Sequence, residues 1–281
     1  MTTRAQRRRI HRRRVQRRRT LAGLVAALGM TGAALTTSVL LAPAGAAGSW
    51  PSPSGGKAVT ETIEVSGTFD GGLKRYRAGG ELGDGGQGDG RDAVFTLKDG
   101  AELTNVVLSP SGADGVHCLG SCTLRNVWWE DVGEEAATFE GTSADAVYTV
   151  TGGGARHAAD TVFQFNGMGK LKLSGFQAVD FGKLVGSCAN CRTQYRRSVI
   201  VHDVDLTAPG KEIAAINVNY GDIAELRDIR LHGDSGGIEP STGIEPCVRY
   251  LGNNTGAEPA RTGSGPDGIN CRYAPGNVSS D

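Results

Sequence analysis

Short alternating runs of apolar and polar residues recur along the chain, separated by turns rich in Gly, Asn and Asp. The clearest runs start 21, 23, 24, 28 and 27 residues apart. They begin at Leu103, Leu124, Val147, Leu171, Val199 and Leu226. Alternation indicates β-strands, and a period in the twenties indicates stacked coils of a solenoid. The dense L-x-x-L-x-L pattern of leucine-rich repeats is absent, so we expect an all-β, right-handed parallel β-helix in a single domain.

Residues 1–46 have the features of an export signal. Ten arginines and no acid precede an apolar run from Leu21 to Leu41, which leads to Ala44-Gly45-Ala46. This order predicts a signal peptide cleaved after Ala46 or Ala47 rather than a membrane anchor, because Gly, Ala and Thr dilute the apolar run. We therefore expect a secreted, extracellular protein, and the export route stays open.

The rest of the chain divides into a short linker and one domain. Residues 47–58 are rich in Gly, Ser and Pro and are predicted to be a linker. Residues 59–281 are long enough for one domain and show no second break in composition. The repeat ends near residue 233, so we predict that the remaining residues form a disulfide-tied cap over the last coil.

Loss of the leader makes the protein acidic. The whole chain has 30 basic and 30 acidic residues, and the leader contains ten of the basic ones. The mature chain therefore has 20 basic against 30 acidic residues, a net charge of −10. This balance argues against nucleic acid or an anionic membrane as a partner. We expect a monomer.

All six cysteines lie in the mature chain, and an even number in an exported protein predicts disulfides. Their spacing favours the pairs Cys118–Cys122, Cys188–Cys191 and Cys247–Cys271 among fifteen possible connectivities. A zinc site built from the first four cysteines is the alternative.

The most informative stretch is Ala113–Gly141, which reads ADGVHCLGSCTLRNVWWEDVGEEAATFEG. Five of its acidic residues fall within twenty-two positions, namely Asp114, Glu130, Asp131, Glu134 and Glu135. Carboxylates on successive coils provide the oxygen ligands that calcium requires, although a solvated acidic loop is the alternative. Trp128 and Trp129 are adjacent in the same stretch, so one is expected in the core and the other on an exposed surface that stacks sugars.

This stretch resembles the pectate lyases of polysaccharide lyase family 3. The resemblance covers Glu61–Tyr273 and continues through YTVTGGG at 148–154, VFQFN at 162–166, FGKL at 181–184 and SCANC at 187–191. It implies calcium-dependent cleavage of polygalacturonate, the acidic backbone of pectin, by β-elimination. In that reaction a base removes the C5 proton of a galacturonate unit and the bond to the C4 oxygen breaks.

Residue by residue, the resemblance implies calcium ligands at Asp114, Glu134 and Glu135, where the family usually has Asp at the last position. It implies a catalytic role for Lys183. Arg192 and Asp89 are the candidate substrate-binding residues.

Three basic positions of the family are occupied by other residues here, namely Thr161, Gly186 and Glu140. Two interpretations follow. In the first, the chain is an active lyase in which Lys183 acts with Arg192, Arg196 or Arg197. In the second, it is a catalytically weakened or inactive calcium-dependent pectin-binding protein. A structural solenoid that needs no metal is a third, weaker option.

Overall fold

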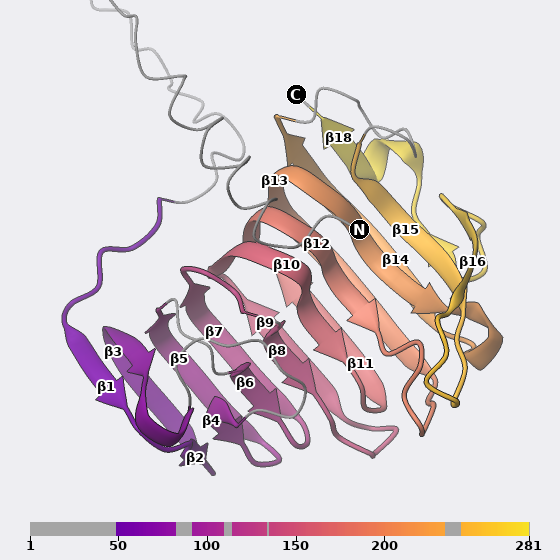
Figure 1. Ribbon diagram of the computed structural model, residues 1–281. Helices are drawn as coiled ribbons and strands as arrows, with labels where there is room; N and C mark the ends of the chain where they lie inside the picture. The colour runs from indigo at the N-terminus through magenta and orange to yellow at the C-terminus, as the bar shows by residue number, and fades with distance from the viewer. Residues whose placement is uncertain (1–48, 83–91, 110–113, 134, 234–242, 281) are drawn as a thin grey trace, which may run out of the picture. The chain divides into compact units, whose positions relative to one another are not determined.

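β-Strands make up most of the residues that the computed structural model describes, which are 49–82, 92–109, 114–133, 135–233 and 243–280, and nearly all of these strands are parallel. These residues belong to one compact unit, in which the strands rise coil by coil from β1 to β18 (Figure 1). Their helices are three short 3₁₀ turns, at Gly80–Leu82, Val218–Tyr220 and Pro275–Asn277. None of the helices in the described ranges is long and apolar enough to span a membrane. Asp89, Glu134 and the predicted leader lie outside the described residues.

The strands form three parallel sheets, because many of them bend at a corner and continue into the next sheet. Sheet 1 consists of β2 (Ile63–Val65), β4 (Ala93–Leu97), β6 (Asp114–Cys118), β8 (Glu135–Phe139), the second halves of β10 (Gly154–Phe165) and β12 (Gln177–Ser187), the end of β13 (Arg197–Asn217) and β15 (Glu245–Leu251). Sheet 2 consists of the first halves of β3 (Thr68–Ala78), β5 (Ala101–Leu108) and β7 (Cys122–Trp129), then β9 (Val147–Thr151), β11 (Gly169–Ser174), the start of β13, the first half of β14 (Ile223–His232) and β17 (Cys271–Arg272). Sheet 3 consists of β1 (Gly56–Val59), the second halves of β3, β5 and β7, the first halves of β10 and β12, the middle of β13, the second half of β14 and β18 (Val278–Ser280).

This architecture confirms the predicted parallel β-helix, and all six apolar runs of the repeat lie in sheet 2. Leu103 pairs with Leu124, as the aligned runs predict. Leu124 pairs with Val150, three residues beyond the start of the third run. Turns of unequal length separate the coils, so the start of a run does not by itself fix the register.

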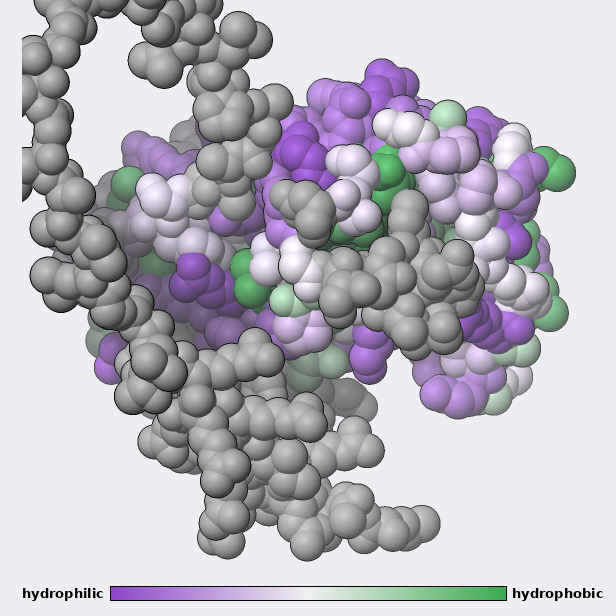
Figure 2. Space-filling view, turned by 90° about the horizontal axis from the view of Figure 1, so that it is seen from above, coloured by the Kyte–Doolittle hydropathy of each residue, from purple (hydrophilic) through white to green (hydrophobic). Residues whose placement is uncertain are grey.

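The interior is a column of stacked apolar side chains. Along sheet 1 one inward row pairs Val116 with Ala137, Ala137 with Phe163 and Phe163 with Val185. Phe163 is fully buried and its ring lies 6.0 Å from that of Phe139 on the preceding coil. Polar colours dominate the visible described surface (Figure 2). Each coil buries its apolar side chains only against its neighbours, as a solenoid requires.

Asparagine builds the corner between sheets 2 and 3. Asn105 and Asn126 have φ values of 52° and 55°, a left-handed conformation that Asn adopts more readily than most residues. Asn126 donates a hydrogen bond from Nδ2 to Oδ1 of Asn105 at 2.7 Å, and Trp128 Nε1 donates to Oδ1 of Asn126 at 2.6 Å. In the L-x-N-V pattern of the repeat, the Leu therefore points into the core, the Asn forms the corner, and the Val begins the part of the strand that lies in the next sheet.

The segment expected to be a linker, residues 47–58, is partly folded onto the β-helix. Strand β1 pairs with β3, and Trp50 packs edge-on against Trp128 with ring centroids 5.0 Å apart. The guanidinium of Arg156 lies 3.6 Å from the centre of the Trp50 ring. A free sheet edge and an exposed tryptophan both favour such packing, so the ordered fold begins before Val59.

The C-terminal segment continues the coils, whereas the sequence predicted a cap that departs from them. Strand β15 adds to sheet 1 in parallel with β13, and β17 and β18 add to sheets 2 and 3. Only β16 (Ala260–Ser264) is antiparallel to its partner among these strands. The repeat is hidden in the sequence because long turns separate the last strands.

The three predicted disulfides are all present, as Cys118–Cys122, Cys188–Cys191 and Cys247–Cys271. No cysteine is free. A zinc site made of the first four cysteines is therefore excluded.

Replacing Asn126 tests the corner. Asn126→Val loses two hydrogen bonds and places a β-branched residue at positive φ, so we expect the free energy of unfolding to fall by about 2–4 kcal/mol. Denaturant unfolding followed by circular dichroism measures it. Asn126→Gly loses the same hydrogen bonds without the backbone strain and should lose roughly half as much. Equal losses would show that the left-handed conformation costs nothing here.

Candidate functional site

One outward-facing row of sheet 1 carries the candidate chemistry. Thr161 pairs with Glu135 on one side and with Lys183 on the other, and Lys183 pairs with Glu212. The register of β6 and β8, continued by two residues from Val116 and Ala137, places Asp114 beside Glu135. Because neighbouring strands are about 4.8 Å apart, Glu135 and Lys183 are separated by about 10 Å along this row.

The row faces outward because two consecutive buried residues follow each of its members Glu135, Thr161 and Lys183. Val162 and Phe163 are both fully buried, so Thr161 before them and Gln164 after them face the other side. Leu184 and Val185 repeat this pattern in the next coil, which leaves Lys183 and Gly186 facing outward.

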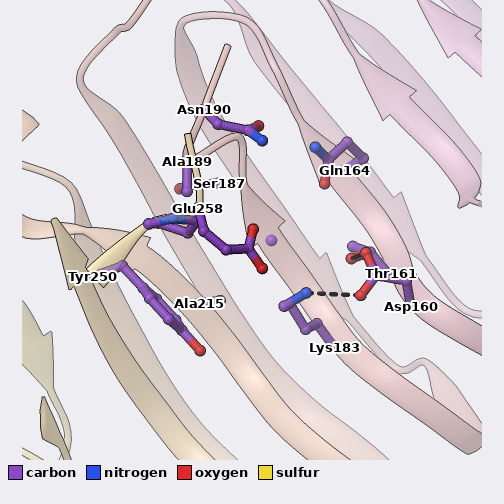
Figure 3. A pocket seen from close by; sticks show the side chains of 12 residues that line it. Asp160, Thr161, Gln164, Lys183, Ser187, Ala189, Asn190, Ala215, Tyr250 and Glu258 are labelled. Carbon is purple, nitrogen blue, oxygen red and sulfur yellow. Dashed lines mark hydrogen bonds and ion pairs between the residues drawn. The ribbon is translucent and has the colours of Figure 1, made fainter. Parts of the chain in front are cut away.

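Lys183 lies in a cleft of about 330 Å³ over the last coils of sheet 1. The cleft is lined by Asp160, Thr161, Gln164, Lys183, Gly186, Ser187, Ala189, Asn190, Ala215, Tyr250, Glu258 and Pro259. Lys183 donates a hydrogen bond from Nζ to Oδ1 of Asp160 at 2.8 Å (Figure 3). Burial opposes ionisation of Asp160, but the hydrogen bonds from Lys183 and Thr161 lower the pKa of its carboxyl group below the usual value.

The far wall of the cleft comes from the C-terminal coil. Glu258 extends its carboxylate into the cleft from the segment before β16, toward the side on which Lys183 lies (Figure 3). The hydroxyl of Tyr250, on β15, donates a hydrogen bond to Oε1 of Glu212 at 2.7 Å. Burial and this hydrogen bond raise the pKa of Tyr250, so the phenol stays neutral.

The acidic end of the row lies two coils earlier. Asp114 contacts Nε2 of His117 through Oδ2 at 3.2 Å, and Nδ1 of the same histidine lies 3.9 Å from Glu140. Burial alone would lower the pKa of His117, but the carboxylates of Asp114, Glu140 and Glu135 raise it. The donor set thus consists of oxygens in a negative environment, which suits a hard cation. Among the described residues, which exclude Glu134, no three His, Cys, Asp or Glu side chains form a group that could hold a metal.

The A-D-G sequence couples this acidic end to the core. A Cβ added at Gly115 would lie 2.6 Å from Nε1 of the buried Trp129 and would collide with the backbone carbonyl of Ala136. Only glycine therefore fits between these two coils. The close packing at Gly115 therefore fixes Asp114 relative to Trp129 and to the strand that begins at Glu135. This explains why the A-D-G, W-W and E-E-A motifs occur together.

Two features of the acidic stretch have roles away from this row. Glu130 accepts hydrogen bonds from Arg75 at 2.7 and 2.9 Å, on the side of sheet 3. Trp129 is in the core as predicted, but Trp128 is 7% exposed under Trp50 and is not an open sugar-stacking surface. The sequence missed this cover because residues 47–58 looked like a linker.

The arginines near the cleft divide into exposed and buried residues. Arg192 is exposed and does not line the cleft, although Asn190 does. Arg197, a candidate to complement Lys183, is 1% exposed and donates hydrogen bonds to the carbonyl oxygens of Gly167 and Asn166 at 3.0 and 2.8 Å. It therefore cannot reach a substrate.

A buried ion pair holds the Arg197 side chain. Asp222 is fully buried, lies 4.0 Å from the Arg197 guanidinium and accepts a 2.8 Å hydrogen bond from the Arg197 amide. Burial raises the pKa of Asp222. This pair fixes the chain that follows the cleft residues Ala189 and Asn190, so its role is to position the wall.

The fold and the cleft define a right-handed parallel β-helix protein with a polar groove along one sheet. A sequence profile of the pectate lyase family matches residues 47–255. Pectate lyase E of Emericella nidulans is 41% identical over 225 residues, which cover 80% of this chain and 84% of that protein. The catalytic domain of pectate lyase PelI from Erwinia chrysanthemi has a TM-score of 0.67 and 27% identity, over 80% of this chain and 99% of that domain.

A second structure of the Erwinia chrysanthemi enzyme, in complex with tetragalacturonic acid, has a TM-score of 0.65 and 28% identity over 79% of this chain and 70% of that one. The chain belongs to the pectate lyase family of polysaccharide lyases, family 3.

The structure places Asp114, Glu135 and Lys183 in one row of sheet 1, and it leaves Arg192 outside the cleft. Asp89 and Glu134 lie outside the described residues. Sequence reasoning missed Asp160, Tyr250 and Glu258. Asp160 directly precedes Thr161 and could have been found there, whereas the two C-terminal residues lie in a segment without a recognisable motif.

Removing the buried arginine tests its role. Arg197→Leu leaves Asp222 buried without its cation, so we expect the free energy of unfolding to fall by about 3–5 kcal/mol. Arg192→Leu is the matched control on an exposed side chain and should change it by less than about 0.5 kcal/mol. Thermal or urea unfolding measures both variants. Losses of similar size would contradict the buried ion pair.

Proposed function

We propose that the mature protein is a secreted, calcium-dependent pectate lyase that cleaves polygalacturonate by β-elimination. The observation that carries the proposal is the single row of sheet 1 in which Glu135 lies two strands and Asp114 three strands from Lys183. A linear uronate polymer presents carboxylates at regular intervals, so such a row can engage more than one sugar unit at once.

Asp114 and Glu135, together with Glu134 from the sequence motif, would hold the calcium ion. A bound calcium ion supplies positive charge that neutralises a uronate carboxylate in a protein whose mature chain is acidic. The carboxylates already lie in a negative environment, shown by the raised pKa of His117, and calcium relieves this repulsion.

Lys183 is the cation that the cleft offers to the reacting sugar. Its hydrogen bond to Asp160 orients Nζ toward the cleft rather than along the strand. In the neutral form this nitrogen can accept the C5 proton of the substrate, and in the charged form it stabilises the developing negative charge.

Secretion is part of the proposal. The arginine-rich leader with its apolar run and A-x-A site supports it, and so do three disulfides, which form and persist in oxidising compartments.

The activity is tested with purified mature protein on polygalacturonate, by the ultraviolet absorbance of the unsaturated product. We expect a rate that needs calcium and vanishes with a chelator. Lys183→Ala should lower the rate at least about 100-fold, because a positioned base typically contributes this much. Lys172→Ala, on an exposed lysine of sheet 2, is the matched control and should keep the rate.

A rate that Lys183→Ala does not change would refute the role of this lysine. No product, combined with calcium-dependent retention of the protein on polygalacturonate, would favour the binding protein without lyase activity instead.

Calcium binding has a test that does not need turnover. A ligand that binds only the folded state at 100 times its Kd adds about 2.7 kcal/mol of stability, so calcium should raise the Tm of the mature protein. Asp114→Asn should remove most of this shift. Asp145→Asn removes an exposed acid in the turn before β9 and should leave the shift intact. Equal Tm shifts in the two variants would place the calcium elsewhere.

A further inference from the structure

A second cleft, of about 350 Å³, lies over the first strands of sheet 3. Among the residues that the structure describes, its lining contains Lys57, Arg75 and Arg77 and no acid; the remainder is proline, glycine and alanine. Strands β1 and β3 lie at the opposite end of the solenoid from β15 (Figure 1). Five strand spacings, from β1 through β3, β5, β7 and β10 to β12, are about 24 Å along the stack. This basic cleft is therefore separate from the cleft at Lys183.

The backbone of β3 places the two arginines on the same face. Arg75 and Arg77 are two residues apart, so their Cα atoms are about 7 Å apart and their side chains leave the sheet on one side. Tyr76 between them is buried in the core, which makes that side the outer one. Their partners on the edge strand β1 are Gly56 and Ala58, whose small side chains leave the arginines accessible to solvent.

The basic cleft is positive although the mature chain is acidic. Glu130 accepts hydrogen bonds from Arg75 at 2.7 and 2.9 Å, so it offsets one charge and fixes the direction of that guanidinium. Arg77 is exposed and forms no ion pair within the described ranges. Lys57 adds its charge from the edge of the sheet, where Nζ lies 5.9 Å from the centre of the Tyr76 ring. These cations attract a polyanion that the net charge of −10 elsewhere repels.

Carboxylates carried on a polymer suit this arrangement. A guanidinium binds a carboxylate through two parallel hydrogen bonds, and its charge does not depend on pH in the ordinary range. Cations spaced along one strand can meet carboxylates of successive sugar units. Polygalacturonate carries a carboxylate on every unit, whereas a neutral galactan carries none. Arginine binds such a group without a metal ion, in contrast to the acidic row of sheet 1.

We propose that the basic cleft, formed by Arg75 and Arg77 with Lys57 at its edge, is a second binding site for polygalacturonate that works without calcium. The inference rests on the proposed function only for the identity of the polymer. One stretch of polymer is held on sheet 3 while sheet 1 stays open to another. The tethered stretch keeps the local concentration of substrate high, so the protein remains on the polymer between successive encounters at sheet 1.

The experiment titrates the mature protein with polygalacturonate by isothermal titration calorimetry, in the presence of a chelator. Without calcium the acidic row of sheet 1 repels the polymer, so binding reports on the basic cleft. We expect binding at about 0.01 M salt and loss of most of it at about 0.15 M, because the Debye length shortens from about 30 Å to about 8 Å. A neutral galactan should not bind.

Charge variants test the residues. Lys57→Gln/Arg77→Gln should weaken the binding at least about fivefold, since one exposed ion pair contributes up to about this much. Glu130→Gln releases the charge of Arg75 and should strengthen the binding about two- to fivefold. Arg125→Gln/Lys172→Gln is the matched control, which removes two charges from exposed residues of sheet 2 and should change the binding by less than about twofold. Circular dichroism melting curves confirm that each variant is folded.

Two results would overturn the inference: no binding by the unaltered protein in chelator at low salt, or equal losses in the basic-cleft variant and the sheet-2 control. Either result leaves the lyase function standing, because calcium-dependent formation of the unsaturated product is measured separately. A protein that forms no product but keeps the calcium-independent binding, with the expected loss in Lys57→Gln/Arg77→Gln, would refute the lyase function and support the second site.

Discussion

In-register stacking of parallel strands is the constraint on which the rest of this structure depends. An inward residue such as Phe163 must lie directly over its counterparts Ala137 and Val185, or the core column is interrupted. Once the inward rows are aligned, the outward rows are aligned as well, since residues paired across neighbouring strands point to the same side of the sheet. Asp114, Glu135, Thr161 and Lys183 therefore form a line. Packing in the core is what places the chemistry on the surface.

Polar groups fix the points where the chain leaves a sheet. Asn105 and Asn126 support one corner through hydrogen bonds along the stack, and Arg197 with Asp222 supports another inside the protein. Breaking the Arg197–Asp222 pair leaves a buried polar group without its partner, which costs more than an exposed contact returns. This pair fixes the chain that follows Ala189 and Asn190, which line one wall of the cleft.

The sequence predicted what depends on repetition. The apolar runs and the disulfides between close cysteines follow from short motifs of the sequence. The candidates Asp114, Glu135 and Lys183 come from the resemblance to the family, and the structure adds that they share one row of sheet 1. The sequence did not predict the contacts between distant segments. Nothing in the local pattern indicates that Trp50 covers Trp128, or that Glu258 reaches the cleft from the last coil. Arg192 and Arg197 are the same residue type five positions apart, and Arg197 is buried through contacts with Asp222, Gly167 and Asn166 from other coils.

The row of sheet 1 has two ends of different electrostatic character, so the proposed calcium ligands and the proposed catalytic lysine lie in different surroundings. At the first end, Asp114, Glu135 and Glu140 concentrate negative charge enough to raise the pKa of His117, so an anionic sugar can be held there only through a cation. At the other end, Lys183 and Asp160 neutralise each other at 2.8 Å and Glu258 adds a negative charge. About 10 Å of sheet lies between Glu135 and Lys183, a distance comparable to the Debye length at physiological ionic strength. Under the proposed function, the acidic end would hold a uronate unit through calcium, and Lys183 would meet the reacting unit two strands further along the row.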